Sequence, residues 1–200
     1  AEAGLNKEDV RALAKRWGIS AWDRPAMACL SSRFPYGTAV TSAGLKMIDA
    51  AEAFLRRELG YAQVRTRHHE TLARIELPEA DLAELLANAE RCHQLADTLI
   101  AIGYLQVTVD LRGFRSGSMN EALLSIELSD APIFERMPTI FARHQLEPAA
   151  YEERGQMLYL RLSAEHRARL STTSLRQTLI SDCEALGFRY IALDLEPLHA

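Results

Sequence analysis

The sequence reads Ala101-Ile102-Gly103-Tyr104-Leu105-Gln106-Val107-Thr108-Val109-Asp110-Leu111 and, further on, Ala185-Leu186-Gly187-Phe188-Arg189-Tyr190-Ile191-Ala192-Leu193-Asp194-Leu195. Each stretch has the pattern of a helix end, a glycine and a strand whose apolar side chains alternate. A second pair of segments, 71–78 and 156–163, corresponds in sequence in the same way. The sequence therefore predicts an α/β (α+β) fold made of two repeated helix-strand-strand-helix-strand units.

The elements of the first copy are bounded by caps and breakers. Thr41 or Ser42 can cap a helix that runs through Leu59, and Gly60 would end it. The other expected elements are two strands at 61–68 and 71–77, one long helix from Pro78 to Gly103 and a strand at 104–111. In the second copy, Pro138 is expected to break or kink the opening helix.

Composition excludes several classes of protein. The chain of 200 residues is 48% apolar and 25% charged, with a net charge of −4, which disfavours sequence-independent binding of nucleic acid. No apolar run approaches the roughly 18 residues that cross a bilayer, and the first residues lack a signal-peptide pattern. Three distant cysteines form no disulfide framework. We therefore expect a cytoplasmic protein that binds neither nucleic acid nor membrane.

One cysteine lies in a turn-rich segment, Pro25-Ala26-Met27-Ala28-Cys29-Leu30-Ser31-Ser32-Arg33-Phe34-Pro35-Tyr36-Gly37-Thr38. Downstream, Arg65 and Arg67 fall on one face of an expected strand, because side chains alternate between faces. Arginine binds phosphate in a fork geometry and lowers the pKa of a nearby thiol. The pattern suggests a nucleophilic thiol beside an anion site.

Several separated motifs also carry a family resemblance. They are Trp22-Asp23-Arg24-Pro25-Ala26 through Gly37, Val64-Arg65-Thr66-Arg67-His68, Ala73-Arg74-Ile75-Glu76 and Val109-Asp110-Leu111-Arg112-Gly113-Phe114-Arg115-Ser116-Gly117-Ser118-Met119-Asn120. Over residues 5–121 the chain resembles the ATP-dependent sacrificial sulfur transferases. That family belongs to the PP-loop ATP pyrophosphatases and works on the nickel-pincer nucleotide cofactor of lactate racemase.

The resemblance implies a reaction and a set of site residues. Cys29 would be the catalytic sulfur donor, and Arg33 its expected activator. The substrate or phosphate would be bound by Arg33, Arg65, Arg67, Arg74 and Tyr36. ATP and Mg²⁺ would be required, the substrate would be a nucleotide-like small molecule, and the protein would form a homo-oligomer.

The chain departs from the family pattern at one point. It contains no Ser-Gly-Gly-x-Asp-Ser loop for ATP. We therefore expect a C-terminal part of such an enzyme, inactive without an N-terminal PP-loop half as partner. The expected domains are 1–40, the end of a Rossmann-like PP-loop domain with the active-site loop, 41–121, the substrate-binding repeat, and 122–200, a degenerate repeat. A helix capped by Asn6 and a strand at Ile19–Trp22 would form the end of the first domain.

Other candidate ligands have weaker patterns. Glu76, and with it Glu52, has the hard carboxylate oxygens that suit Mg²⁺. The neighbours His68 and His69 would point to opposite faces of a strand, which makes them a poor pair for zinc. Cys92 is expected to pack in the core.

Cys183 is expected to pack in the core as well. The sequence has no Cys-x-x-Cys pair, and nothing in the cysteine spacing supports an iron–sulfur cluster. The loop at Ser116–Asn120 could cradle an anion or simply connect the repeats.

Comparison of the copies assigns the site to one of them. Arg65 and Arg67 correspond to Ala150 and Glu152, and Arg74 corresponds to Tyr159. The second copy lacks this set of arginines, so we expect the first copy to carry the anion site and the second to support it or to mediate assembly.

Alternatives to sulfur transfer remain open at this stage. Cys29 is a buried structural cysteine in the simplest interpretation, and the arginines are surface strand residues paired with carboxylates such as Glu70 or Glu76. Another PP-loop activity, RNA thiolation or amide synthesis, is a second alternative. A non-catalytic substrate-binding or oligomerisation module is the third.

Overall fold

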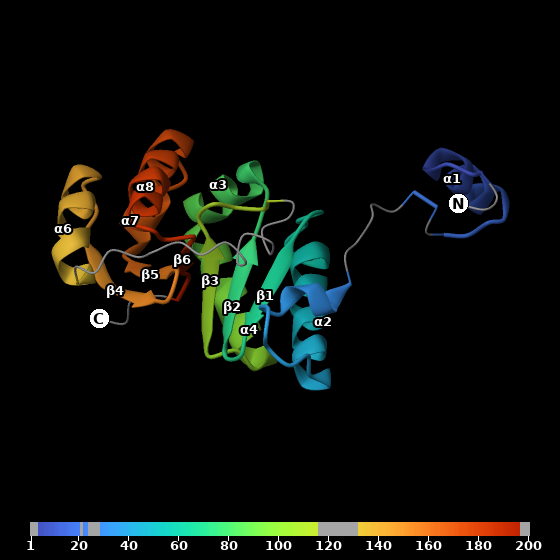
Figure 1. Ribbon diagram of the computed structural model, residues 1–200, viewed down its shortest axis with the longest axis horizontal. Coiled ribbons are helices and arrows are strands. Elements are labelled where there is room, and N and C mark those ends of the chain that lie inside the picture. The colour runs from blue at the N-terminus through green and yellow to red at the C-terminus, as the bar shows by residue number, and fades with distance from the viewer. Residues whose placement is uncertain (1–3, 21, 24–28, 116–131, 197–200) are drawn as a thin grey trace.

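The computed structural model describes residues 4–20, 22–23, 29–115 and 132–196 (Figure 1). Within them a six-stranded mixed sheet has the order β1-β2-β3-β6-β5-β4. The strands are β1 (Arg65–His69), β2 (Leu72–Glu76), β3 (Gln106–Asp110), β4 (Pro148–Arg154), β5 (Met157–Leu162) and β6 (Tyr190–Asp194). No described helix is both long and apolar enough to cross a membrane.

The two halves of the sheet repeat one topology. In the first, β1 is antiparallel to β2 and β2 is parallel to β3; in the second, β4, β5 and β6 pair in the same way. The glycines that precede β3 and β6, Gly103 and Gly187, both adopt positive φ angles, of 126° and 94°. The repeated glycine thus marks a backbone conformation that other residues rarely adopt.

The halves join where β3 runs antiparallel to β6. Val109 pairs with Leu193, and on either side of it Thr108 pairs with Asp194 and Asp110 with Ala192. Neither three-stranded half would bury its sheet face well alone, and the junction makes one continuous sheet of them.

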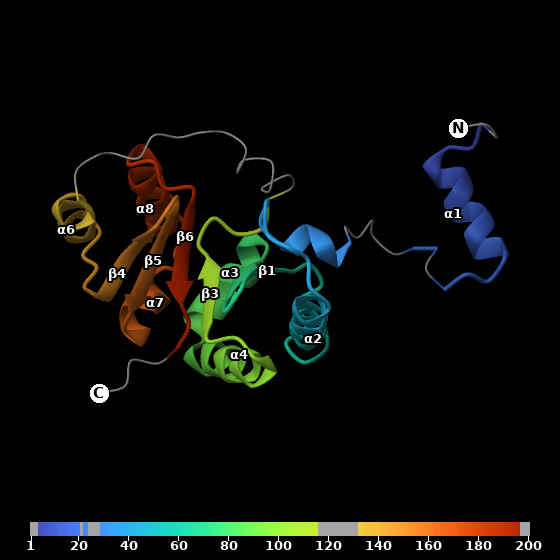
Figure 2. The ribbon, with the colours of Figure 1, turned by 60° about the horizontal axis from the view of Figure 1, so that its bottom comes forward.

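Helices cover one face of this sheet (Figures 1 and 2). They are α2 (Ser42–Arg57), α3 (Glu79–Ala87), α4 (Ala89–Ile102), α6 (Ile133–Arg143), α7 (Ala164–Arg169) and α8 (Thr173–Ala185). Strand residues such as Ile75, Val109 and Leu193 share one apolar core with helix residues such as Leu55 and Leu99. Because side chains alternate along strands, residues such as Arg74, Glu76 and Asp110 lie on the opposite face.

Three details differ from the sequence-based expectations. The helix expected over 78–103 is two helices, because Asn88 leaves the helical conformation and its side chain caps α4 through the backbone N–H of Arg91. Pro138 does not break α6, which continues through it. Ile19, Ser20 and Trp22 form turns and irregular backbone instead of a strand.

The N-terminal helix α1 (Lys7–Arg16) lies apart from the sheet (Figure 1). Asn6 caps it as predicted, by accepting hydrogen bonds from the backbone N–H groups of Glu8 and Asp9. None of its residues is buried.

Candidate functional site

The candidate nucleophile, Cys29, has an exposed thiol at the start of η1 (Leu30–Arg33), a short 3₁₀ helix. Its Sγ atom lies 2.8 Å from the Oγ atom of Ser31. This hydrogen bond, followed by one from the backbone N–H of Ser32, lowers the pKa of Cys29 below its ordinary value. The exposed thiol is therefore more readily ionised than an ordinary one.

Arg33, the expected activator, contacts Glu52 and Ser32. Its Nε atom donates to Glu52 at 2.8 Å and one Nη donates to the hydroxyl of Ser32 at 3.0 Å. The hydrogen bonds that lower the pKa of Cys29 come from Ser31 and Ser32, and activation by Arg33 stays a prediction.

We expect Ser31→Ala to slow alkylation of Cys29 at neutral pH. Loss of the hydroxyl raises the pKa of the thiol towards its ordinary value, so a smaller fraction is thiolate at a given pH. Iodoacetamide labelling as a function of pH, followed by peptide mass spectrometry, measures the change. Cys92 is an internal control, because burial raises its pKa to about 11. Equal labelling rates in both proteins would contradict the role of Ser31.

Ser32 ties the Cys29 turn to the sheet. Its hydroxyl donates to the carbonyl of Cys29 at 2.8 Å, and its own carbonyl accepts a hydrogen bond from Arg67 at 2.9 Å. With the Arg33 contact described above, one serine joins the thiol-bearing turn to two arginines. The turn is thereby held at a fixed place beside β1.

Glu52 is a fully buried carboxylate on the core face of α2. It accepts hydrogen bonds from Arg33, from Arg56 at 2.5 Å and from the backbone N–H of Thr66 at 3.1 Å. A buried carboxylate requires such partners, because burial without them is costly. Glu52 therefore fixes η1, α2 and β1 relative to one another.

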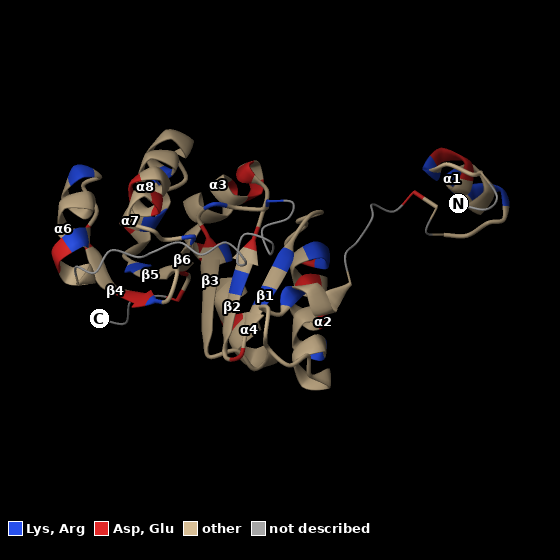
Figure 3. Ribbon diagram, in the orientation of Figure 1, with Lys and Arg blue, Asp and Glu red and all other residues tan. Residues whose placement is uncertain are grey.

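Arg67 and Arg74 share a second buried carboxylate, Glu76. Figure 3 shows the basic segments of β1 and β2 and the acidic segment of β2 on this part of the sheet. Arg67 binds both of its oxygens, at 2.9 and 3.0 Å, and Arg74 donates to one of them at 3.2 Å. Arg74 also forms an ion pair with Asp110 of β3. Burial raises the pKa of Asp110, although the charge of Arg74 opposes this shift. The carboxylate partners expected for surface arginines are thus present, but the whole group is buried.

Arg65 lies apart from that group, although it belongs to the same strand face as Arg67. Its guanidinium lies 4.2 Å from the centre of the Phe114 ring and donates to the carbonyl of Arg115 at 3.0 Å. Burial, and then the charge of Arg67, lowers its pKa.

Arg33, Arg67 and Arg74 line one cavity of about 170 Å³, together with Pro35, Tyr36, His69 and Tyr190. A second pocket, of about 350 Å³, contains Cys29 and shares Pro35 and Tyr36 with the first. The structure therefore places the thiol pocket and the arginine cavity next to each other. Tyr36, 56% exposed, stands between them.

Tyr190 brings the second repeat into this cavity. Its ring lies 4.2 Å from the guanidinium carbon of Arg74. Strand β6 of the second repeat therefore supplies part of the wall of the cavity that the arginines of the first repeat line. In the second copy, Tyr159 stands where the first has Arg74, and Glu152 stands where the first has Arg67. These two residues lie opposite each other in the antiparallel register of β4 and β5.

The geometry offers no support for a metal at Glu76, whose oxygens both accept from arginine. Among the described residues no group of three His, Cys, Asp or Glu side chains is placed to hold a metal ion. His68 and His69 diverge as predicted: His68 packs between Phe34 and Tyr104, and His69 lines the arginine cavity.

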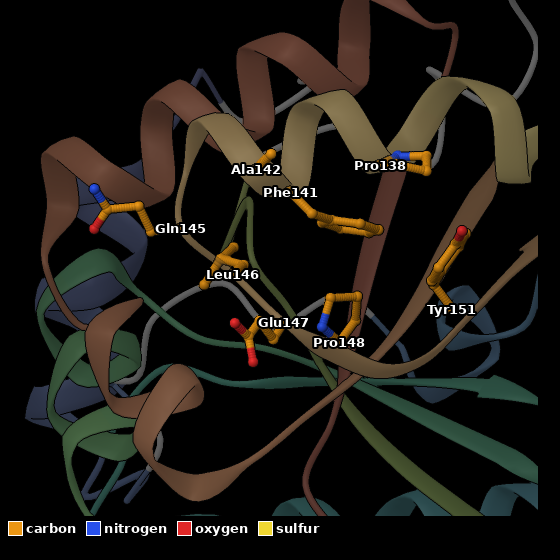
Figure 4. Close-up of a pocket in the computed structure, with 8 residues that line it drawn as sticks. All are labelled: Pro138, Phe141, Ala142, Gln145, Leu146, Glu147, Pro148 and Tyr151. Atoms are coloured by element: carbon orange, nitrogen blue, oxygen red, sulfur yellow. The ribbon is translucent and has the colours of Figure 1, made fainter.

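Cys92 and Cys183 are buried in the core, as expected. The loop at Ser116–Asn120 lies outside the described residues. A wider cavity of about 590 Å³ lies between α6 and β4, where Figure 4 shows Phe141, Leu146 and Tyr151 around an apolar hollow. It offers no nucleophile and one carboxylate, Glu147, and we do not assign the reaction to it.

Gly44, in the first turn of α2, allows the Cys29 segment to pack closely. A Cβ atom there would lie 2.7 Å from Cζ of Phe34 and 2.9 Å from Nε2 of His68. We expect Gly44→Ala to lower the free energy of unfolding by about 1–3 kcal/mol, because both rings must move. Urea denaturation measures this, with the exposed neighbour variant Ser42→Ala as control. Unchanged stability of Gly44→Ala would show that the packing of Phe34 is loose.

The sequence of the chain is similar to those of several known proteins. No protein-family model matches the chain. Over 128 residues it is 44% identical to pyridinium-3,5-bisthiocarboxylic acid mononucleotide synthase of Lactiplantibacillus plantarum, a match of 64% of this chain and 45% of the synthase. The chain is related to this synthase. The resemblance predicted from the sequence motifs is thereby confirmed.

Two further relatives have no assigned function. An uncharacterised protein of Synechocystis is 43% identical over 62% of this chain and 45% of its own length. Another, of Methanocaldococcus jannaschii, is 29% identical over 58% of the chain and 43% of its own length. The matched part spans about half the length of each relative, so the activity of the whole synthase does not pass to this chain by similarity alone.

Asp110, Tyr190 and Ser31 were not singled out as site residues from the sequence. Asp110 has a usable signal, because it ends its strand at the position that Asp194 holds in the other copy. Tyr190 has none, because its approach to Arg74 depends on the pairing of β3 with β6.

Proposed function

We propose that the chain is the sulfur-donating part of an ATP-dependent sulfur transferase that forms thiocarboxylates on a pyridinium mononucleotide. One observation carries the proposal: an exposed thiol with a lowered pKa lies in a pocket that shares Pro35 and Tyr36 with a cavity lined by three arginines. A carboxylated mononucleotide has a phosphate for the arginines and a carboxyl group for the thiol. The relation to the Lactiplantibacillus plantarum synthase supports this substrate class.

The chemistry assigned to Cys29 has two steps. Its thiolate attacks the carbonyl carbon of an adenylated carboxylate, a C–S bond forms and AMP leaves with the electron pair of the broken C–O bond. The Cα proton of Cys29 is then removed and its Cβ–S bond breaks, so the sulfur leaves on the substrate as a thiocarboxylate and the protein keeps dehydroalanine. No external oxidant or reductant is needed, and each chain transfers one sulfur atom.

The other site residues bind and orient the substrate. Arg33, Arg67 and Arg74 would hold the phosphate, since guanidinium groups match phosphate geometry. Tyr36 would lie along the substrate between the two pockets, and Arg65 would add positive charge from the same strand as Arg67. ATP supplies the adenylate, which we assign to a nucleotide-binding PP-loop half acting with this chain, and we derive no step through Mg²⁺.

Mass spectrometry of the intact protein tests the proposal. The chain is expressed together with a nucleotide-binding PP-loop half and incubated with ATP, Mg²⁺ and the carboxylated mononucleotide. We expect Cys29 to lose the mass of H₂S and peptide mapping to locate dehydroalanine there. An unchanged Cys29, with ATP and substrate both bound, would overturn sacrificial transfer.

Two broader properties belong to the same proposal. A reducing cytoplasmic setting would keep Cys29 as a free thiol before its single turnover. Assembly into a homo-oligomer would be measured by light scattering, independently of the chemistry at Cys29.

A further inference from the structure

Two buried nitrogen atoms without hydrogen-bond partners belong to residues that line the arginine cavity. They are Nε2 of His69 and Nε of Arg74, and neither has a partner within the described part of the chain. Arg74 is 2% exposed, and its other contacts engage Nη1 and the face of its guanidinium group. A buried polar group without a hydrogen-bond partner is destabilising, so two such atoms at one cavity point to a missing partner.

The surroundings of His69 favour an acceptor of negative charge. Arg33, Arg67 and Arg74 line the same cavity, and no carboxylate is among the described residues that line it. Glu76 and Asp110, the acidic partners of these arginines, are fully buried. The two nitrogen atoms without partners therefore lie at a cavity in which every charged side chain among the described lining residues is basic.

The size of the cavity restricts the ligand. Its volume of about 170 Å³ is below the roughly 300 Å³ at which pockets for whole small molecules begin. It accommodates a phosphate group and excludes a complete nucleotide, whose remaining part must extend past Tyr36 towards the pocket of Cys29.

We propose that His69 is a phosphate-binding residue, whose Nε2–H group and the Nε–H group of Arg74 donate to the same phosphomonoester. This inference rests on the proposed function, and it adds a neutral donor and a subsite to it. A neutral imidazole donates a directional hydrogen bond to the phosphate without adding positive charge to a site that already contains three arginines.

The protonation state of His69 follows from what faces it. Burial, and then the charges of Arg74, Arg67 and His68, lowers its pKa to about 3. Arg33, Tyr36 and Tyr190 complete the cavity around it, and none of them is acidic. Between about pH 5.5 and 8, free phosphate gains its second negative charge and an ordinary histidine loses its positive charge. His69 is neutral throughout this range and keeps one N–H donor.

Titration with inorganic phosphate and with ribose 5-phosphate, by calorimetry and by ³¹P NMR, tests the inference on this chain alone. We expect His69→Ala to weaken binding about tenfold, the effect of losing one hydrogen bond to a charged group. His69→Gln, whose amide reaches a similar position, should recover most of the affinity. His93→Ala, on α4 and outside the cavity, is the matched control.

A pH series separates the proposed donor from a charged histidine. With a neutral His69, affinity follows the ionisation of phosphate and rises with pH up to about 7. An imidazolium ligand would instead make affinity fall as pH rises through about 6.5, and that profile would overturn the inference. So would unchanged affinity in His69→Ala.

Failure of phosphate binding by the unmodified chain would also overturn the inference, because the two donors would then be satisfied by water. The proposed function is judged separately, by the mass of Cys29. Suppose that the unmodified chain forms dehydroalanine at Cys29 and that the His69→Ala variant binds phosphate normally. The role of His69 would then be refuted, and the proposed sulfur transfer would stand.

Discussion

Cys29→Ser is expected to abolish formation of the thiocarboxylate product completely, while the fold and phosphate binding stay unchanged. The hydroxyl of serine can form an ester with the activated carboxyl group, but it has no sulfur to leave on the substrate. Because the thiol is exposed and makes its side-chain contact within its own turn, its replacement disturbs little of the structure.

Product analysis by mass spectrometry, with the nucleotide-binding half, ATP and substrate present, measures this effect. Cys183→Ser is the matched control: it removes another free thiol, buried in α8, and should retain sulfur transfer at some cost in stability. Thiocarboxylate formed by Cys29→Ser at the normal yield would mean that the sulfur comes from another source.

Glu76→Gln is expected to lower the free energy of unfolding by about 3–5 kcal/mol, the cost of leaving buried charges uncompensated. Glu76 is fully buried and accepts hydrogen bonds from both Arg67 and Arg74. The amide keeps the shape of the side chain but removes its charge, so two buried guanidinium groups lose an anionic partner. A domain is stable by only about 5–15 kcal/mol, so a large part of its stability is lost.

Chemical denaturation followed by circular dichroism measures the loss. Glu152→Gln is the control: this carboxylate is 58% exposed and pairs with Arg154, an arrangement worth less than about 1 kcal/mol. A change below about 1 kcal/mol in Glu76→Gln would show that water reaches the arginine group, contrary to the burial described above.

The duplicated plan of the fold was predictable because it depends on local patterns. Alternation and the glycines at 103 and 187 predict the third strand of each copy, and both glycines have the positive φ angle that selects this residue. The break at Asn88 was not predictable from spacing, because apolar residues continue at helical intervals on both sides of it. The extended backbone of Asn88 and the hydrogen bond from the backbone N–H of Arg91 to its side chain separate the two helices.

The sequence singles out Cys29 and the arginines as candidate site residues, but it does not predict how they are connected. Glu52 carries a local signal, since it lies between Ile48 and Leu55 on the apolar face of α2, where a charge needs a partner. The identity of that partner, Arg33, depends on how the turn after Cys29 folds back onto the helix. Such long-range pairings are set by tertiary packing, which a single sequence does not specify.

The junction of β3 with β6 has the symmetry of a homodimer contact. The pairs Thr108–Asp194 and Asp110–Ala192 exchange places under a half-turn about the Val109–Leu193 pair, as like edges of two identical subunits would. Two such subunits would carry two equal sites. Joined in one chain, they can evolve separately, and here one half keeps the arginines while the other contributes an aromatic wall, Tyr190, to its neighbour's cavity.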